Sequence, residues 1–302
     1  MNIRSVLKPS IQTLRHACAG TLWTLEFDQR GVARAAFCGN RAQGRGTPTS
    51  MGSSSLVRTL ETQLQDWRQR KFPRWVWVNP RADAYVEGAR DLGALTTRVV
   101  STLASRGIGA LIHTRGGMPA GDGLVLVGRR FPGLLRVDLE FFSFRFDVTR
   151  RWERGASSLD ARLDLLRRLR ASGVEVGVRL GPIIPSVNDD PSDWTPLLKR
   201  LSELGIDHVT PTWLTPSRRL MTQIRREVSD ESARRIESII QSSDDTLYAQ
   251  WRVATMNMLR HRAKPLGMEV TRCHCGPDVV QSSTCVVGPS EVVKERQLAL
   301  FG

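Results

Sequence analysis

Apolar segments of strand length alternate along this chain with segments in which apolar residues recur at helical spacing. Four leucines between residues 158 and 172 form one stripe of a helix whose other face is Arg and Asp. This alternation predicts repeated β/α units with a parallel sheet. We expect six strands, over Thr21–Phe27, Arg74–Asn79, Gly109–Thr114, Leu134–Phe144, Val174–Pro182 and His208–Trp213. We expect the connecting helices over Ser55–Gln69, Leu92–Arg106, Ser158–Ser172 and Ser192–Leu204.

Six such units favour an α/β fold of the partial (β/α)6 TIM-barrel type, because no glycine-rich dinucleotide loop follows the first strand. The ligand face of such a barrel is formed by the carboxyl ends of its strands. After Trp213 the alternation is expected to stop, and Ser229–Gln241 and Thr246–Lys264 have helical character. We therefore predict a partial barrel over residues 1–215, helices and a Cys-His-Cys segment over 216–296, and a separate tail over 297–302.

The chain is strongly basic, with 44 Lys+Arg against 30 Asp+Glu in 302 residues and a formal net charge of +14. Such a surface attracts polyanions through counterion release, so we expect DNA as a partner, the alternative being a solvated basic surface. Arg115, Arg145 and Arg179 are the candidates for phosphate contacts at the strand ends. Since the sequence has no apolar run of membrane-spanning length and no apolar signal region, we expect a cytoplasmic protein without a membrane partner.

The stretch 141–189 carries the most informative motif. It predicts a strand, a turn, a helix opened by serine and a second strand that closes on Gly-Pro-Ile-Ile-Pro. Its marked positions are Ser143, Glu153, Arg162, Gly173, Pro182 and Pro185, and Thr114-Arg115-Gly116 lies at an earlier strand end. Together these residues resemble the radical SAM family of spore photoproduct lyase, over roughly residues 50–215. The resemblance implies a partial (β/α)6 barrel, and we take Ser143, Arg115 and Arg179 as candidates for cofactor binding.

The chemistry of that family departs from this sequence at the cluster motif. Members hold a [4Fe–4S] cluster by Cys-x3-Cys-x2-Cys just after the first strand, which leaves one iron open to S-adenosylmethionine. The best-placed match begins at Cys18, and its second and third positions are Leu22 and Leu25. One thiolate cannot hold this cluster, and Cys38 lies too far along to repair the spacing. We therefore expect a catalytically degenerate member without S-adenosylmethionine chemistry.

A second group of candidate ligands is Cys273-His274-Cys275, followed by Cys285. Thiolate and imidazole are ligands for Zn²⁺, and thiolates also hold iron–sulfur clusters. We predict a metal site with these three cysteines as ligands and His274 or Cys18 as the fourth. The alternative is three reduced structural thiols, because a cytoplasmic location argues against a stable disulfide.

The last residues, Gln297-Leu298-Ala-Leu300-Phe301-Gly, resemble the peptide by which bacterial polymerases and repair proteins dock on the sliding clamp. In that mode Leu298, Leu300 and Phe301 fill apolar pockets, and the Gln297 amide makes directed hydrogen bonds. The alternative is an apolar tail that folds back into the core.

Several other residues have simpler interpretations. His113, at a predicted strand end, has no identified partner, and at least one of Trp75 and Trp77 is expected in the core. Asp138 and Glu140 share a strand face, where they are expected to pair with arginine.

These observations predict a catalytically degenerate protein of the spore photoproduct lyase type in DNA repair or replication. It is expected to bind DNA, the sliding clamp and other repair or replication proteins. One alternative is an active radical SAM repair lyase with unusual ligation through Cys18, Cys38 or the C-terminal thiols. The other is a non-catalytic adaptor that uses the barrel as a protein-binding platform.

Overall fold

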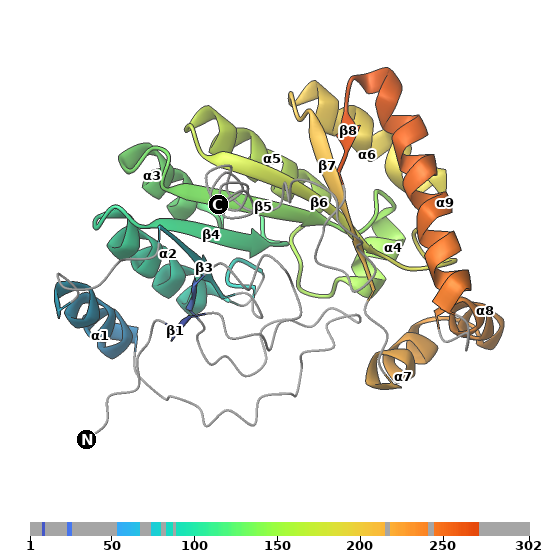
Figure 1. Cartoon of the computed structure of the whole chain (residues 1–302), viewed down its shortest axis with the longest axis horizontal. Coiled ribbons are helices and arrows are strands. Elements are labelled where there is room, and N and C mark those ends of the chain that lie inside the picture. Colours follow the sequence, from blue (N-terminus) through green and yellow to red (C-terminus); the bar gives the residue numbers. More distant parts are fainter. Residues whose placement is uncertain are drawn as a thin grey trace, which may run out of the picture.

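A computed structural model describes residues 8–9, 23–25, 53–66, 74–79, 83–86, 89–214, 218–240 and 245–271 of the chain. Its strands form one sheet in chain order, β1 to β8 (Figure 1). The first pair is antiparallel, and every later pair is parallel. The strands are β1 (Lys8–Pro9), β2 (Trp23–Leu25), β3 (Trp75–Val78), β4 (Gly109–Thr114), β5 (Leu135–Phe141), β6 (Glu175–Ile183), β7 (His208–Trp213) and β8 (Glu269–Val270).

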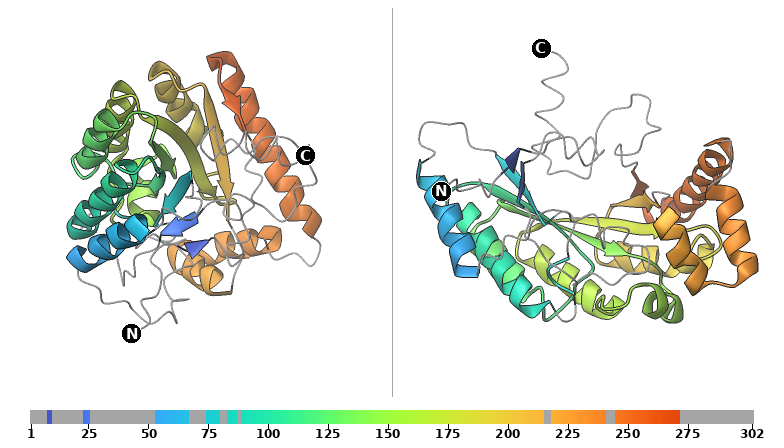
Figure 2. Two further views of the ribbon diagram at one scale, coloured as in Figure 1. Left: turned by 60° about the vertical axis from the view of Figure 1, so that its left-hand side comes forward. Right: turned by 90° about the horizontal axis from the view of Figure 1, so that it is seen from below.

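Helices follow the parallel strands and lie on one side of the sheet (Figure 2). They are α1 (Ser53–Asp66), α2 (Arg90–Ala104), α3 (Asp122–Arg130), α5 (Leu159–Ala171) and α6 (Pro191–Glu203). The six predicted strands and four predicted helices are confirmed, with ends that differ by a few residues. The fold is therefore an α/β partial barrel of the predicted kind.

The apolar core lies between the sheet and these helices, because alternate strand residues point toward them. Val76, Ile112 and Leu139 from the strands and Leu103 and Leu166 from the helices are fully buried in one cluster. The other residues of each strand face the opposite, concave side. Both predicted ends of α5 are also confirmed. At its start the Ser158 hydroxyl accepts a hydrogen bond from the Ala161 N–H. After its end Gly173 adopts a left-handed conformation with φ 77°.

The alternation does not stop at Trp213, contrary to the prediction. The helix α9 (Asp245–Ala263) leads through the short 3₁₀ turn η2 (Lys264–Leu266) to β8, which pairs in parallel with β7. The N–H groups of Glu269 and Thr271 donate to the carbonyls of Asp207 and Val209. A two-residue strand is too short for residue alternation to mark it, and for this reason the sequence pattern missed it.

Three further helices complete the described fold: α4 (Phe146–Trp152), α7 (Arg218–Glu227) and α8 (Asp230–Ile240). They cover a second apolar cluster, which includes Phe142 and Ile184 beyond the ends of β5 and β6. Of these three helices, the sequence predicted only α8. It did not predict α4, which is too short to display a helical period, or α7, whose sequence is dominated by arginine. The described part of 216–296 thus consists of α7, α8, α9, η2 and β8. Among the described helices, none is both long and apolar enough to cross a membrane.

Candidate functional site

The concave face of the sheet carries ionisable side chains on β4, β5 and β6, whereas the helix-covered face is apolar. The strand register brings His113 of β4 beside Asp138 of β5, and Glu140 of β5 beside Arg179 of β6. Thr210 of β7 pairs with Arg179 in turn. These side chains share one face because residues opposite each other in neighbouring strands point the same way. The parallel strands therefore gather ionisable groups from sequence-distant segments.

His113 has a carboxylate partner, which the sequence did not identify. Its Nε2 lies 3.3 Å from Oδ2 of Asp138, and its ring centroid lies 4.6 Å from that of Trp77. Burial and the Arg179 charge lower the pKa of His113, while Asp138 opposes them. Burial alone would raise the pKa of Asp138, but Arg136, whose Nε lies 2.9 Å from its Oδ1, holds this pKa below its ordinary value. Both pKa values are lowered, so a neutral, partly buried imidazole faces a buried, ionised carboxylate, an arrangement in which His113 can accept a proton.

A glycine makes room for this pair. A Cβ at Gly177 would overlap Asp138 Oδ1 and would lie 2.8 Å from Nη2 of Arg136. Gly177 pairs directly with Asp138 in the sheet. Any larger residue would therefore displace the carboxylate that faces His113.

A second network joins the end of β4 to α5. The Arg115 guanidinium pairs with Glu140 through Nη2 and lies 3.1 Å from Glu153 through Nε. Arg162 donates from Nη2 to Glu153 at 2.5 Å, from Nη1 to the Glu140 carbonyl at 2.7 Å and from Nε to the Ser157 carbonyl at 2.8 Å. Glu153 and Arg162 are buried. These two motif residues are therefore structural partners that fix the turn between α4 and α5.

Asp83 anchors the same strand end from another segment. Its carboxylate accepts hydrogen bonds from the Thr114 hydroxyl at 2.6 Å and from the Arg115 N–H at 2.5 Å. No motif in the sequence marks Asp83, because its two partners lie more than thirty residues along the chain.

Ser143 lies in the loop after β5 and is buried. Its hydroxyl donates to Asp193 and accepts from the Arg145 N–H at 2.9 Å. Arg145 in turn donates from Nε to Asp193 at 3.0 Å and from Nη2 to the Val187 carbonyl at 2.6 Å. Asn188 ties the loop further by donating to the Phe142 carbonyl at 2.6 Å. Ser143 thus organises the strand end, together with Asp193 and Asn188, which the sequence had not singled out.

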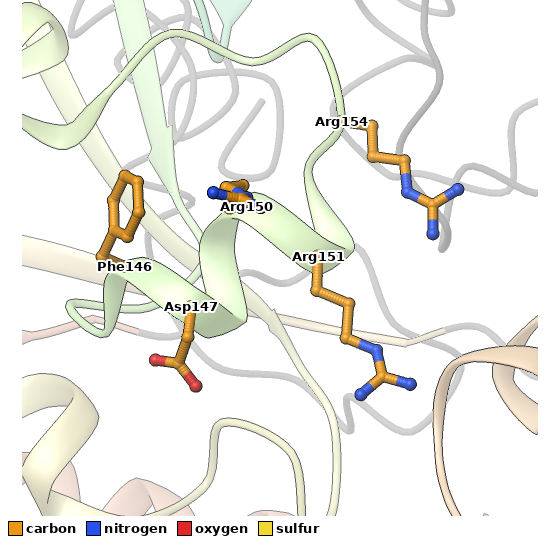
Figure 3. Close-up of a pocket in the computed structure, with 5 residues that line it drawn as sticks. All are labelled: Phe146, Asp147, Arg150, Arg151 and Arg154. Atoms are coloured by element: carbon orange, nitrogen blue, oxygen red, sulfur yellow. The ribbon is translucent and has the colours of Figure 1, made fainter.

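An exposed surface is formed by α4, beyond the end of β5 (Figure 3). Phe146, at the first position of this helix, is 71% exposed. A cavity of about 440 Å³ is lined by Phe146, Asp147, Arg150, Arg151 and Arg154. The sequence contains a signal for this surface, because Phe146 and Arg150 are four positions apart and are therefore neighbours on a helix.

The structure thus brings two of the three predicted cofactor-binding residues to the concave face. Arg115 and Arg179 both neighbour Glu140, whereas Ser143 lies in the adjoining loop. Trp75 and Trp77 are both buried. Asp138 pairs with Arg136 and Glu140 pairs with Arg115, as expected. The remaining predicted residues lie outside the described part: Cys18, Cys38, Cys273, His274, Cys275, Cys285, Gln297, Leu298, Leu300 and Phe301. Within the described residues no group of three or more His, Cys, Asp or Glu side chains has metal-site geometry.

The position of Leu25 corrects the placement of the cluster motif. Leu25 lies in β2, is fully buried in the core and accepts a hydrogen bond from the Asn79 N–H at 2.8 Å. The match that begins at Cys18 therefore runs into the strand instead of following it. The segment that does follow β2, residues 26–52, contains a single cysteine, Cys38. Three cysteine ligands cannot come from that segment.

Comparison with solved structures identifies the same architecture elsewhere. The chain is similar to spore photoproduct lyase complexed with dinucleoside spore photoproduct, at 15% identity and a TM-score of 0.50, over 72% of this chain and 66% of that protein. A single-residue variant of spore photoproduct lyase matches over the same shares at 15% identity and a TM-score of 0.47. The match thus spans slightly less than two thirds of that protein's length. No protein-family model and no curated protein matches the chain. At this identity the likeness establishes a shared fold.

Proposed function

We propose that this chain is a catalytically degenerate, spore photoproduct lyase-like protein that binds DNA in repair or replication. The observation that carries the proposal is the combination of this fold with Leu25 buried in β2. The cluster that the family resemblance implies does not fit the residues present, because the segment after the first parallel strand offers one thiol. The barrel would therefore serve as a binding scaffold.

Charge supports DNA as the partner. Besides the net charge of +14, the segment beyond β5 carries three arginines whose side chains are 41–63% exposed: Arg145 before α4, Arg151 within α4 and Arg154 after it. Guanidinium groups bind phosphates with directed hydrogen bonds, so these residues are suited to a DNA backbone. Arg115 is less suited to that role, because its guanidinium is held between Glu140 and Glu153.

The tail Gln297–Gly302 would tether the protein to the bacterial sliding clamp, and the Cys273, Cys275 and Cys285 group would hold Zn²⁺ or an iron–sulfur cluster. The tether gives a reason for a basic, DNA-binding barrel to act at replicating or repaired DNA.

A second candidate is an active repair lyase. It is favoured by the concave face, where His113, near the carboxyl end of β4, faces the buried carboxylate of Asp138, because a barrel enzyme has its active site on the side of the carboxyl ends. Such an enzyme would require ligation outside the usual motif, through Cys18, Cys38 or the C-terminal thiols.

The deciding experiment measures iron and sulfide in anaerobically purified and reconstituted protein, together with 5′-deoxyadenosine formed from S-adenosylmethionine. The proposal expects no 5′-deoxyadenosine, whatever metal the C-terminal cysteines bind. Four irons per chain with 5′-deoxyadenosine formation would establish the active lyase instead. DNA binding is tested separately by fluorescence anisotropy on a duplex at increasing salt. Affinity should fall steeply with salt, and absence of binding at low salt would refute the DNA proposal.

A further inference from the structure

The most unusual side chain on the described surface is Phe146. It is the only aromatic residue among the strongly exposed large apolar side chains of the described segments. The other aromatic residue of α4, Trp152, is buried and stacks on Phe142 at a centroid distance of 6.0 Å. Trp152 thus fixes the helix to the second apolar cluster, while Phe146 extends into solvent. An exposed ring on an anchored helix is preorganised for a ligand, because leaving apolar area in water is unfavourable.

The surroundings of Phe146 are cationic. Arg150 lies one turn further along α4 and lines the same cavity (Figure 3). Arg151 and Arg154 extend the cavity wall and share a single carboxylate, Glu227, at 3.5 Å and 3.1 Å. Asp147 also lines the cavity, and in Figure 3 its side chain leaves the helix on a different side from Phe146. In the same view Arg150 leaves α4 on the side of Phe146, whereas Arg151 leaves it on the side of Asp147. Arg150 is therefore the arginine beside the exposed ring, and Arg151 and Arg154 continue the basic wall of the same cavity.

We infer that this surface of α4, formed by Phe146, Arg150, Arg151 and Arg154, binds single-stranded DNA, with one base stacked on the Phe146 ring. The inference rests on the proposed DNA binding and specifies the form of DNA. Aromatic rings that stack on bases beside arginines that contact phosphates are the usual means of binding single strands.

Two other occupants fit the surface less well. A protein interface has a core depleted of charged residues, whereas the cavity beside this ring is lined by three arginines and an aspartate. An intact duplex keeps its bases stacked, so it offers phosphates to the arginines but no free base face to Phe146. A single strand satisfies both the ring and the guanidinium groups.

The test uses the full chain and a fluorescein-labelled oligothymidylate, compared with the same oligonucleotide carrying abasic sites. Phe146→Ala should weaken oligothymidylate binding by about 5-fold to 100-fold, as expected for one lost stacking contact. Leu126→Ala is the matched control, since Leu126 is 59% exposed on α3 and lies on the helix-covered side. The control should leave affinity unchanged. Abasic sites should weaken binding to the original chain and have little effect on Phe146→Ala.

A tryptophan at position 146 provides a second measurement, which reports contact between the ring and a base and not a difference in affinity between variants. Phe146→Trp should show fluorescence quenching when oligothymidylate is added, beyond any change seen with Leu126→Trp. Arg150→Ala should reduce the slope of log affinity against log salt by about one.

The outcomes separate the two proposals. Equal affinities of Phe146→Ala and the original chain for oligothymidylate, or no response to abasic sites, would overturn the stacking inference while DNA binding stands. Loss of sliding-clamp binding in Phe146→Ala with unchanged DNA affinity would assign the surface to a protein partner instead. Failure of the original chain to bind any DNA at low salt would overturn the proposed function and this inference together.

Discussion

Replacing Arg162 by methionine tests the central structural claim about the strand ends. The Arg162 side chain is 2% exposed and donates hydrogen bonds to the Glu153 carboxylate and to two backbone carbonyls. Methionine retains much of the aliphatic volume and removes all three donors. Glu153, whose pKa is already raised by burial against the opposing charges of Arg162 and Arg115, would keep only Arg115.

The magnitude follows from this geometry. Removing one partner of a buried ion pair costs about 3–5 kcal/mol. Here Glu153 would lose its shorter ion pair and its charge would be less well balanced, since only Arg115 at 3.1 Å would remain beside it. With a urea m-value of about 3 kcal/mol/M, the unfolding midpoint should fall by about 1–1.7 M at constant m. Arg167→Met is the matched control on the same helix, since Arg167 pairs with Asp164 at the surface and its side chain is 63% exposed. Its midpoint should stay within experimental error of the original chain.

Urea unfolding followed by far-ultraviolet circular dichroism gives both midpoints. A double variant, Glu153→Gln with Arg162→Met, should unfold at higher urea than Arg162→Met alone, because the buried carboxylate that lost its main partner is then neutral. Equal midpoints for Arg162→Met and Arg167→Met would refute the reasoning. A double variant less stable than Arg162→Met would show that the unpaired Glu153 is not the source of the loss.

Three further predictions concern other parts of the chain. Gly177→Ala should destabilise the fold by about 1–3 kcal/mol, because its Cβ would overlap Asp138; an unchanged urea midpoint would contradict the packing described. Since the pKa of His113 is lowered on folding from its ordinary 6.5, the unfolded chain binds the proton more readily, and stability should fall as the pH drops below 6.5. His113→Gln should flatten that decline in melting temperature, and an equally steep decline would count against it. Deleting Gln297–Gly302 should abolish capture by the sliding clamp and leave the melting temperature unchanged, whereas a lowered melting temperature with intact capture would indicate that the tail packs into the core.

The sequence predicted those features that depend on local pattern. Six of the eight described strands, β2 to β7, were predicted, because apolar segments of strand length between helical segments mark them directly, whereas the two-residue strands β1 and β8 were missed. The site was predicted less completely, since its contacts join distant segments: Ser143 reaches Asp193 fifty residues away, and His113 reaches Asp138 only through strand register. The resemblance identified Glu153 and Arg162 as marked positions, but only the structure revealed that they are partners. Asp83 carries no sequence signal at all.

The order of strands has a consequence for how a long ligand reaches the concave face. In the described sheet β1 and β8 are the two end strands, so the wall has two lateral margins instead of a continuous circumference. A closed barrel admits a ligand only through its mouth, and a polymer would need a free end or a sharp bend to enter. A wall that is open between β1 and β8, as the described residues form it, would let a continuous strand approach sideways, lie across the concave face and leave in both directions. A protein with such a wall would not need a free DNA end in order to bind within a chromosome.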